Sequence, residues 1–148
     1  MVFVMSGVAQ LTDLALDEIG ALLTEFLWRL DHSDCGSVAE LFVEDGSMRT
    51  PRLELRGRTQ ISEWFIQRSG RREIKTHHTW SNLRIEDARD TELTITTRTV
   101  TLQAPVSTEA GTAHVIVGET RDILHKVATG NWRFASRELT VFFAGSLG

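Results

Sequence analysis

The stretch Thr76-His77-His78-Thr79-Trp80-Ser81-Asn82-Leu83-Arg84-Ile85-Glu86 (residues 76–86) decides the fold of this chain. It contains threonine, tryptophan and isoleucine, and its pattern has a period of two, which is typical of a β-strand. The same period continues toward the end of the chain, where it predicts strands over residues 91–102, 113–126 and 132–143. The last strands are close in sequence and joined by short turns, so we expect an antiparallel sheet.

The residues before this stretch predict helices instead. Between residues 12 and 30, apolar side chains recur at three- and four-residue spacing, as on the buried face of an amphipathic helix. Shorter helical patterns follow at residues 35–42 and 57–67, and a hairpin of residues 47–50 and 53–55 separates them. Helices that precede the long strands in this way pack together on one face of a sheet. The sequence therefore predicts an α+β fold with three N-terminal helices against a curved antiparallel sheet.

Length and charge narrow the class of protein. The 148 residues suit one domain over residues 1–148, with a flexible N-terminal segment expected over residues 1–10. With 16 Lys and Arg against 20 Asp and Glu, the net charge of −4 gives no general attraction to nucleic acid or anionic lipid. The single cysteine, Cys35, permits no internal disulfide, and no run of 18 apolar residues predicts a membrane span. We therefore expect a cytoplasmic protein.

The sequence contains no tyrosine. A phenol therefore cannot serve as acid, base or hydrogen-bond donor in any site of this chain. The histidines and carboxylates also lack the spacing of a metal site, so we expect neither a metal nor another cofactor. Acid–base chemistry then falls to aspartate, glutamate and histidine.

Four motifs in order resemble those of one protein family. They are Leu30-Asp31-His32-Ser33-Asp34, then Leu41-Phe42-Val43-Glu44-Asp45-Gly46, then His78 to Ile85, and finally Gly118 to Asp122 followed by Trp132-Arg133-Phe134 and Arg137. Over residues 14–141 they resemble the SnoaL-like branch of the NTF2-like superfamily. The resemblance implies a conical sheet wrapped around the helices, with a pocket on its concave face. Members include scytalone dehydratase, polyketide cyclases and the small subunits of ring-hydroxylating dioxygenases.

The resemblance implies an acid–base pair of Asp31 and His78. In scytalone dehydratase-like enzymes, an aspartate at the position of Asp31 orients the histidine matching His78 or shares its proton. His77 and His78 are neighbours in a predicted strand, so their side chains point to opposite faces and only one can line a pocket. The motif spacing selects His78. Asp31 could alternatively do no more than end the first helix.

Further residues are candidates for binding a substrate. Strict alternation places Trp80 and Asn82 on the face of His78, and Trp64 lies in the third predicted helix. Both tryptophans suit the wall of a pocket for a flat, ring-containing ligand, or the core. Asn82 could donate its amide hydrogen to a substrate carbonyl or satisfy backbone groups.

The later strands and the third helix add charged and polar candidates. His114, Thr120 and Asp122 share one strand face and are expected to bind substrate if that face is concave, which the sequence leaves open. Arg137 is expected to form an internal ion pair with Asp31 or Asp122. A basic cluster follows the third helix, as a solvated loop or as the rim of a pocket that attracts an anionic ligand: Arg68, Arg71, Arg72 and Lys75.

These observations support two classes of function. The first is a cofactor-independent lyase, isomerase or cyclase that acts on a small hydrophobic cyclic or polyketide-like compound through Asp31 and His78. Scytalone dehydratase-like enzymes have a tyrosine immediately before the aspartate, where this chain has Leu30, so that reaction in its usual form is not expected. The second is a protein without turnover, either a small subunit that packs against an oxygenase large subunit or a ligand-binding protein. In each case we expect a homodimer, because the open sheet face that carries Thr94, Thr96 and Val100 invites self-association.

Overall fold

The computed structural model describes residues 3–4, 13–32, 35–71, 73–107 and 112–147 of the protein. In chain order the elements are β1 (Phe3–Val4), α1 (Asp13–Asp31), the 3₁₀ helix η1 (Cys35–Leu41), β2 (Phe42–Thr50), β3 (Leu53–Arg56), α2 (Gly57–Ser69), β4 (Ile74–Ala88), β5 (Glu92–Pro105), β6 (Ala113–Lys126) and β7 (Trp132–Leu147). The α+β class and the four long strands are as predicted. No helix among the described residues is long and apolar enough to cross a membrane.

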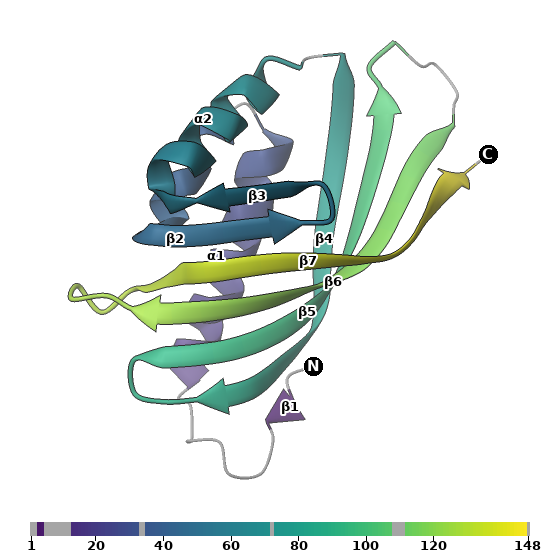
Figure 1. Ribbon diagram of the computed structural model, residues 1–148. Helices are drawn as coiled ribbons and strands as arrows, with labels where there is room; N and C mark the ends of the chain where they lie inside the picture. Colours follow the sequence, from purple (N-terminus) through teal and green to yellow (C-terminus); the bar gives the residue numbers. More distant parts are fainter. Residues whose placement is uncertain (1–2, 5–12, 33–34, 72, 108–111, 148) are drawn as a thin grey trace.

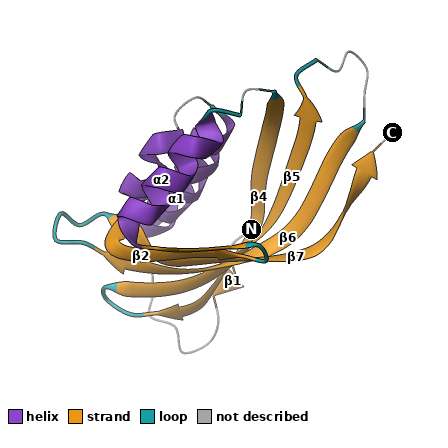
Figure 2. Ribbon diagram, turned by 45° about the horizontal axis from the view of Figure 1, so that its top comes forward, coloured by secondary structure: helices purple, strands orange, loops and turns teal. Residues whose placement is uncertain are grey.

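All strands belong to one curved sheet with the order β1-β4-β5-β6-β7-β2-β3. The four long strands are antiparallel to one another, and one end of this group of strands fans out beyond the helices (Figure 1). The hairpin of β2 and β3 extends this sheet, because β2 pairs in parallel with β7. Both α-helices lie on the same side of the sheet (Figure 2).

One detail of the predicted order needs correction. The helix expected at residues 35–42 is the 3₁₀ helix η1, so only two of the three N-terminal helices are α-helical. Its seven residues connect the end of α1 directly to β2, and such short connections commonly take the tighter 3₁₀ form. The segment 1–10 lies outside the described residues except for β1, which pairs in parallel with β4.

A cluster of four phenylalanines holds α1 against the sheet. Phe26 of α1 lies edge-on to Phe134 of β7, with ring centroids 5.6 Å apart, and also contacts Phe42 and Phe65. All four side chains are buried, and burial of each contributes roughly 1.5–3 kcal/mol. Since α1 also packs along β4, the core fixes the C-terminal end of α1 over the first residues of that strand.

Candidate active site

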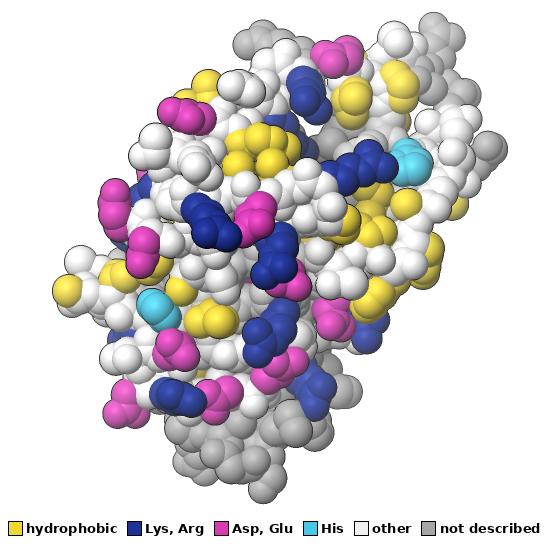
Figure 3. All heavy atoms as spheres, viewed as in Figure 1, with side chains coloured by type: hydrophobic (Ala, Val, Ile, Leu, Met, Phe, Trp, Pro, Cys, Tyr) yellow, Lys and Arg dark blue, Asp and Glu magenta, His cyan; other side chains and the backbone are white. Residues whose placement is uncertain are grey.

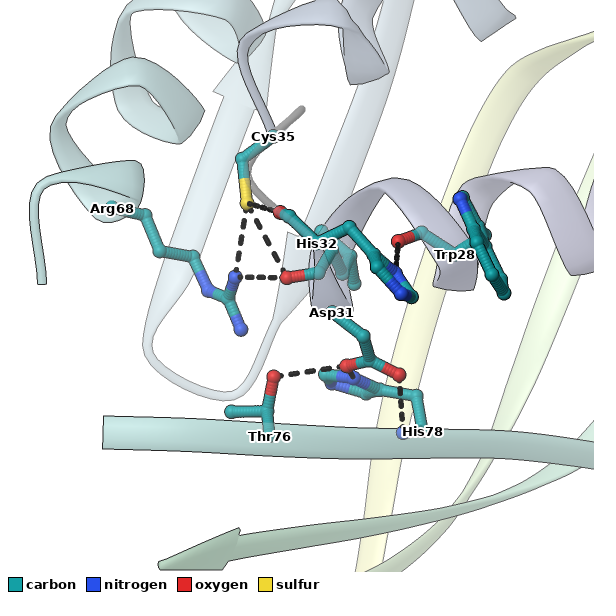
Figure 4. Close-up of polar contacts among 8 residues, drawn as sticks. Trp28, Asp31, His32, Cys35, Arg68, Thr76 and His78 are labelled. Carbon is teal, nitrogen blue, oxygen red and sulfur yellow. Dashed lines mark hydrogen bonds and ion pairs between the residues drawn. The ribbon is translucent and has the colours of Figure 1, made fainter. Parts of the chain in front are cut away.

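Asp31, the last residue of α1, lies against β4 and accepts three hydrogen bonds from it (Figure 4). Its Oδ1 accepts from the hydroxyl of Thr76 at 2.9 Å and from Nδ1 of His78 at 2.5 Å. Its Oδ2 accepts from the backbone N–H of His78 at 2.8 Å. The carboxylate is therefore held in one orientation by two residues of the same strand face.

The contact with Asp31 determines the tautomer of His78. A carboxylate can only accept a hydrogen bond, so Nδ1 carries the proton and Nε2 of the neutral ring is free to accept one. Burial lowers the pKa of His78 below 6.5, although Asp31 opposes this shift, and the positive charge of Arg68 adds to it. The folded protein therefore favours the neutral ring of His78. The neutral ring contributes to the stability of the fold above pH 6.5, and this contribution is lost as the pH falls through the lowered pKa. At neutral pH, His78 is therefore a base with a vacant Nε2.

The end of α1 is fixed by residues from two other elements. The carbonyl of Leu30 accepts a hydrogen bond from Nη1 of Arg68 at 3.2 Å and a weaker one from Sγ of Cys35 at 3.4 Å. His32 stacks on Trp28 with ring centroids 3.8 Å apart and contacts its carbonyl. These contacts satisfy carbonyls that a helix end leaves without partners, and they hold Asp31 in place.

Two hollows meet at Asp31. The larger, which we call the basic cleft, has a volume of about 690 Å³ and lies between the ends of the two α-helices and the first residues of β4. Its walls include Asp31, Thr76 and Gln103 together with three cationic side chains, Arg68, Arg71 and Lys75.

The smaller hollow, which we call the tryptophan hollow, has a volume of about 450 Å³ and runs between α1 and β4. Trp28, Trp80 and His78 line it, and it shares Asp31, His32 and Thr76 with the basic cleft. The side chains of His78 and Asp31 are only 13% and 12% exposed. A small molecule bound here would meet the acid–base pair in a largely dehydrated setting.

The two tryptophans proposed as pocket walls have different positions. Trp80 lies in the tryptophan hollow, and its indole N–H donates to the hydroxyl of Thr24 at 3.0 Å. Trp64 packs edge-on against Phe65 at 4.9 Å and lines neither hollow. Trp64 therefore packs against the hydrophobic core from α2 and is not part of the site.

The expectation that Asn82 shares the face of His78 is wrong. The pairing of β4 with β5 shifts by one residue between Ser81 and Arg84, and Asn82 has a positive φ of 56°. This bulge reverses the alternation, so Leu83 turns into the core. Asn82 instead lines a separate hollow together with Arg84 and Arg98. Its local role is to adopt the left-handed conformation, which asparagine tolerates better than most residues.

Thr120 and Asp122 lie on the concave face of the sheet, which was the condition for their expected role in binding substrate. Both are buried, however, and line neither hollow. Asp122 pairs with Arg137, with Oδ2 and Nη1 3.3 Å apart, and its Oδ1 has no partner. The guanidinium of Arg137 lies over Phe26 at 4.3 Å. Burial raises the pKa of Asp122 to about 6, against the opposing effects of Arg137 and Thr120. This group is a structural element of the core.

His114 lies away from the acid–base pair. Its register partner is Gln103, which in turn pairs with Thr76, so the three share one row on the concave face. His114 is exposed at the open end of this row and lines neither hollow. Among the described residues, no three His, Cys, Asp or Glu side chains are placed to hold a metal ion.

Sequence reasoning missed two residues of the site. Thr76 was part of the predicted strand, two residues before His78, and this spacing alone could have placed it beside Asp31. Gln103 carries no signal of its own in the sequence, because its place in the basic cleft depends on the register between β4 and β5.

The comparison with protein families matches residues 13–138 to the model of the SnoaL-like domain. No curated protein matches the chain significantly. The matched part includes every residue of the acid–base site and of the core described above.

Solved structures resemble the chain closely in fold. A candidate scytalone dehydratase from Novosphingobium aromaticivorans is 22% identical, with a TM-score of 0.78 over 91% of this chain and 89% of that one. A hexachlorocyclohexane dehydrochlorinase of LinA type 3 from Novosphingobium barchaimii is 16% identical, with a TM-score of 0.76 over 91% of each chain. A candidate aromatic ring hydroxylase from N. aromaticivorans is 14% identical, with a TM-score of 0.79 over 93% of this chain and 96% of that one. At these identities the similarity establishes the fold.

Proposed function

The chain belongs to the SnoaL-like family, and from this premise we propose that it is a cofactor-independent lyase or isomerase that uses Asp31 and His78 as its acid–base pair. The observation that carries the proposal is the 2.5 Å contact between Asp31 Oδ1 and His78 Nδ1 in the wall of the tryptophan hollow. A largely buried pair with a fixed tautomer and a vacant Nε2 is suited to accept and return a proton near neutral pH.

An elimination would proceed as follows. His78 Nε2 accepts a proton from a carbon next to a carbonyl group, the C–H electron pair forms a double bond, and a hydroxyl group on the next carbon departs. The imidazolium, stabilised by Asp31, returns the proton to this hydroxyl, so that water leaves and the enzyme is unchanged. An isomerisation uses the same first step and returns the proton to a different carbon. Neither needs a tyrosine.

The substrate class is part of the proposal. Trp28 and Trp80 line the tryptophan hollow, whose volume of about 450 Å³ suits a small ring system such as a cyclic or polyketide-like compound. Two of the structural neighbours carry descriptions of elimination reactions, loss of water in one case and of hydrogen chloride in the other. These descriptions support the class of reaction.

The test is deuterium incorporation by the wild-type chain. Small cyclic ketones and β-hydroxyketones would be incubated with the protein in deuterated water at pH 7.5 and followed by proton NMR. We expect at least one compound to exchange the hydrogen next to its carbonyl, or to lose water, faster than in buffer. Exchange at the buffer rate throughout the panel would contradict the proposal and favour the binding protein without turnover.

We also propose a homodimer that packs two sheets through the face opposite the helices. Val100, Val117 and Phe143 lie directly opposite one another on β5, β6 and β7. Phe143 is 61% exposed, and the neighbouring Phe142 lies beneath Arg98 on the same face. Thr94 and Thr96, which we expected in this surface, are buried. Hydrophobic side chains gather beside β7 in the space-filling view (Figure 3).

Replacement of Phe143 by glutamate should convert this dimer into a monomer, since it buries a charge without a partner. Light scattering after gel filtration measures the molar mass. Leu14→Glu changes an exposed apolar position on α1, is the matched control and should stay dimeric. A monomeric wild-type chain would refute the dimer.

A further inference from the structure

We propose that the substrate carries a carboxylate group and that the basic cleft binds this group beside Arg68. The inference rests on the proposed acid–base function and adds the chemical class of the substrate. Its first support is the charge of the cleft. Arg68, Arg71 and Lys75 line it, whereas Asp31 is the only carboxylate among the lining residues.

These three cations have no carboxylate partner in the described part of the chain. Arginines elsewhere are commonly paired, as Arg98 is with Glu119 and Arg121 with Glu86. Asp31 offsets one of the three cations, so the charged side chains that line the cleft keep an excess of positive charge. The cleft therefore presents uncompensated positive charge to whatever enters it, in a protein whose net charge is −4.

The geometry around Arg68 leaves part of its guanidinium for a ligand. Nη1 donates to the carbonyl of Leu30 and to Sγ of Cys35, which fixes the side chain in place. The remainder of the guanidinium lies on the side of the cleft that Thr76 lines. Figure 4 draws no hydrogen bond or ion pair to this part of the Arg68 side chain. A planar guanidinium offers two parallel N–H groups that match the two oxygens of a carboxylate.

The helix ends favour a monoanion over a doubly charged phosphate. α1 ends at Asp31 and α2 at Ser69, so both helices present their C-terminal ends to the cleft. A helix C-terminus carries a partial negative charge, which opposes an anion of higher charge. Three cations opposed by Asp31 and two such helix ends leave the cleft with a small positive charge, which suits a single carboxylate.

The position of the cleft relates the carboxylate to the chemistry. The basic cleft and the tryptophan hollow share Asp31, His32 and Thr76. A molecule that places its carboxylate beside Arg68 can therefore extend past Asp31 and bring its remaining part to His78 and Trp80. The same cations would stabilise the negative charge that develops on the substrate when His78 removes a proton.

The test compares two probes of the same shape, benzoate and benzamide, by isothermal titration calorimetry at low salt. We expect benzoate to bind at least about 10-fold more tightly than benzamide, and Arg68→Gln to weaken benzoate about 10-fold or more without changing benzamide. Arg52→Gln removes an equal charge from the exposed turn between β2 and β3 and should leave both affinities unchanged. Equal binding of the two probes, or benzoate binding that Arg68→Gln leaves intact, would overturn the proposal.

A second variant separates this inference from the proposed function. His78→Ala should retain the preference for benzoate, because the carboxylate site does not include the imidazole. If His78→Ala binds benzoate normally and loses deuterium incorporation, both proposals stand. If the wild type exchanges neutral ketones but prefers benzamide to benzoate, the carboxylate site is refuted and the acid–base function survives.

Discussion

His78→Ala should lower the rate of deuterium incorporation by about 10²- to 10⁴-fold, the range that a positioned general base contributes. The variant removes the only described imidazole that contacts Asp31, while the carboxylate keeps its hydrogen bonds from Thr76 and from the backbone N–H of residue 78. Nε2 of His78 is the proposed acceptor of the substrate proton. Two other histidines, His32 and His77, also line the tryptophan hollow, but His78 is the one whose Nδ1 contacts Asp31. The rate is measured by proton NMR on the compound that the wild type exchanges.

His77→Ala is the matched control for this loss. The two histidines are neighbours on β4, and both line the tryptophan hollow. His77 is exposed and its side chain has the opposite orientation from that of His78, which contacts Asp31, so its removal should leave the rate within about twofold of the wild type. Both variants should keep the circular dichroism spectrum of the wild type. A His78→Ala chain that is folded and fully active would refute the acid–base pair.

Arg137→Met should lower the free energy of unfolding by about 3–5 kcal/mol at pH 7.5, the range for breaking a buried ion pair. Arg137 is 4% exposed and Asp122 is fully buried, so the variant leaves a carboxylate in the core without its cation. It also removes the contacts of the guanidinium with the rings of Phe26 and Phe134. Urea unfolding followed by tryptophan fluorescence measures the change.

The loss should depend on pH and on Asp122. The pKa of Asp122 is raised to about 6 from 3.8, so its stabilising contribution is full below pH 3.8 and is lost as the pH rises through 6. Without Arg137 the charged form becomes still less favourable, and the variant should be closer to the wild type at pH 5 than at pH 7.5. Adding Asp122→Asn should restore much of the loss. A destabilisation that is equal at both pH values would show that packing, and not charge, explains it.

The order of elements could be read from the sequence because each long segment has one clear period. The four long strands and the helix ending near Leu30 lie within a few residues of their predicted positions. Two features could not be read in this way. The seven residues of η1 are too few for a period to separate an α-helix from a 3₁₀ helix, and the parallel pairing of β2 with β7 joins segments far apart in sequence.

The candidate site shows the same division. Asp31 and His78 could be identified together because two motifs carry them. Strand alternation allows only one of His77 and His78 to line a pocket, and the motif spacing selects His78. The misplacement of Asn82 comes from the bulge at Ser81, since alternation cannot be extended through an inserted residue. The pairing of Arg137 with Asp122 required the register of β6 with β7, which places the two residues directly opposite each other. The role of Arg68 depended on the approach of α2 to the end of α1.

The measurement that tests this account most directly is the state of the His78 ring in the folded protein. Nitrogen-15 NMR of the histidine side chains, with His78→Ala to assign the signal, reports which ring nitrogen carries the proton and at what pH the ring titrates. Because Asp31 accepts the Nδ1 proton and burial lowers the pKa, we predict a neutral ring at pH 7 with its proton on Nδ1 and a pKa below 6.5. A ring that is charged at pH 7, or a neutral ring protonated on Nε2, would contradict the account.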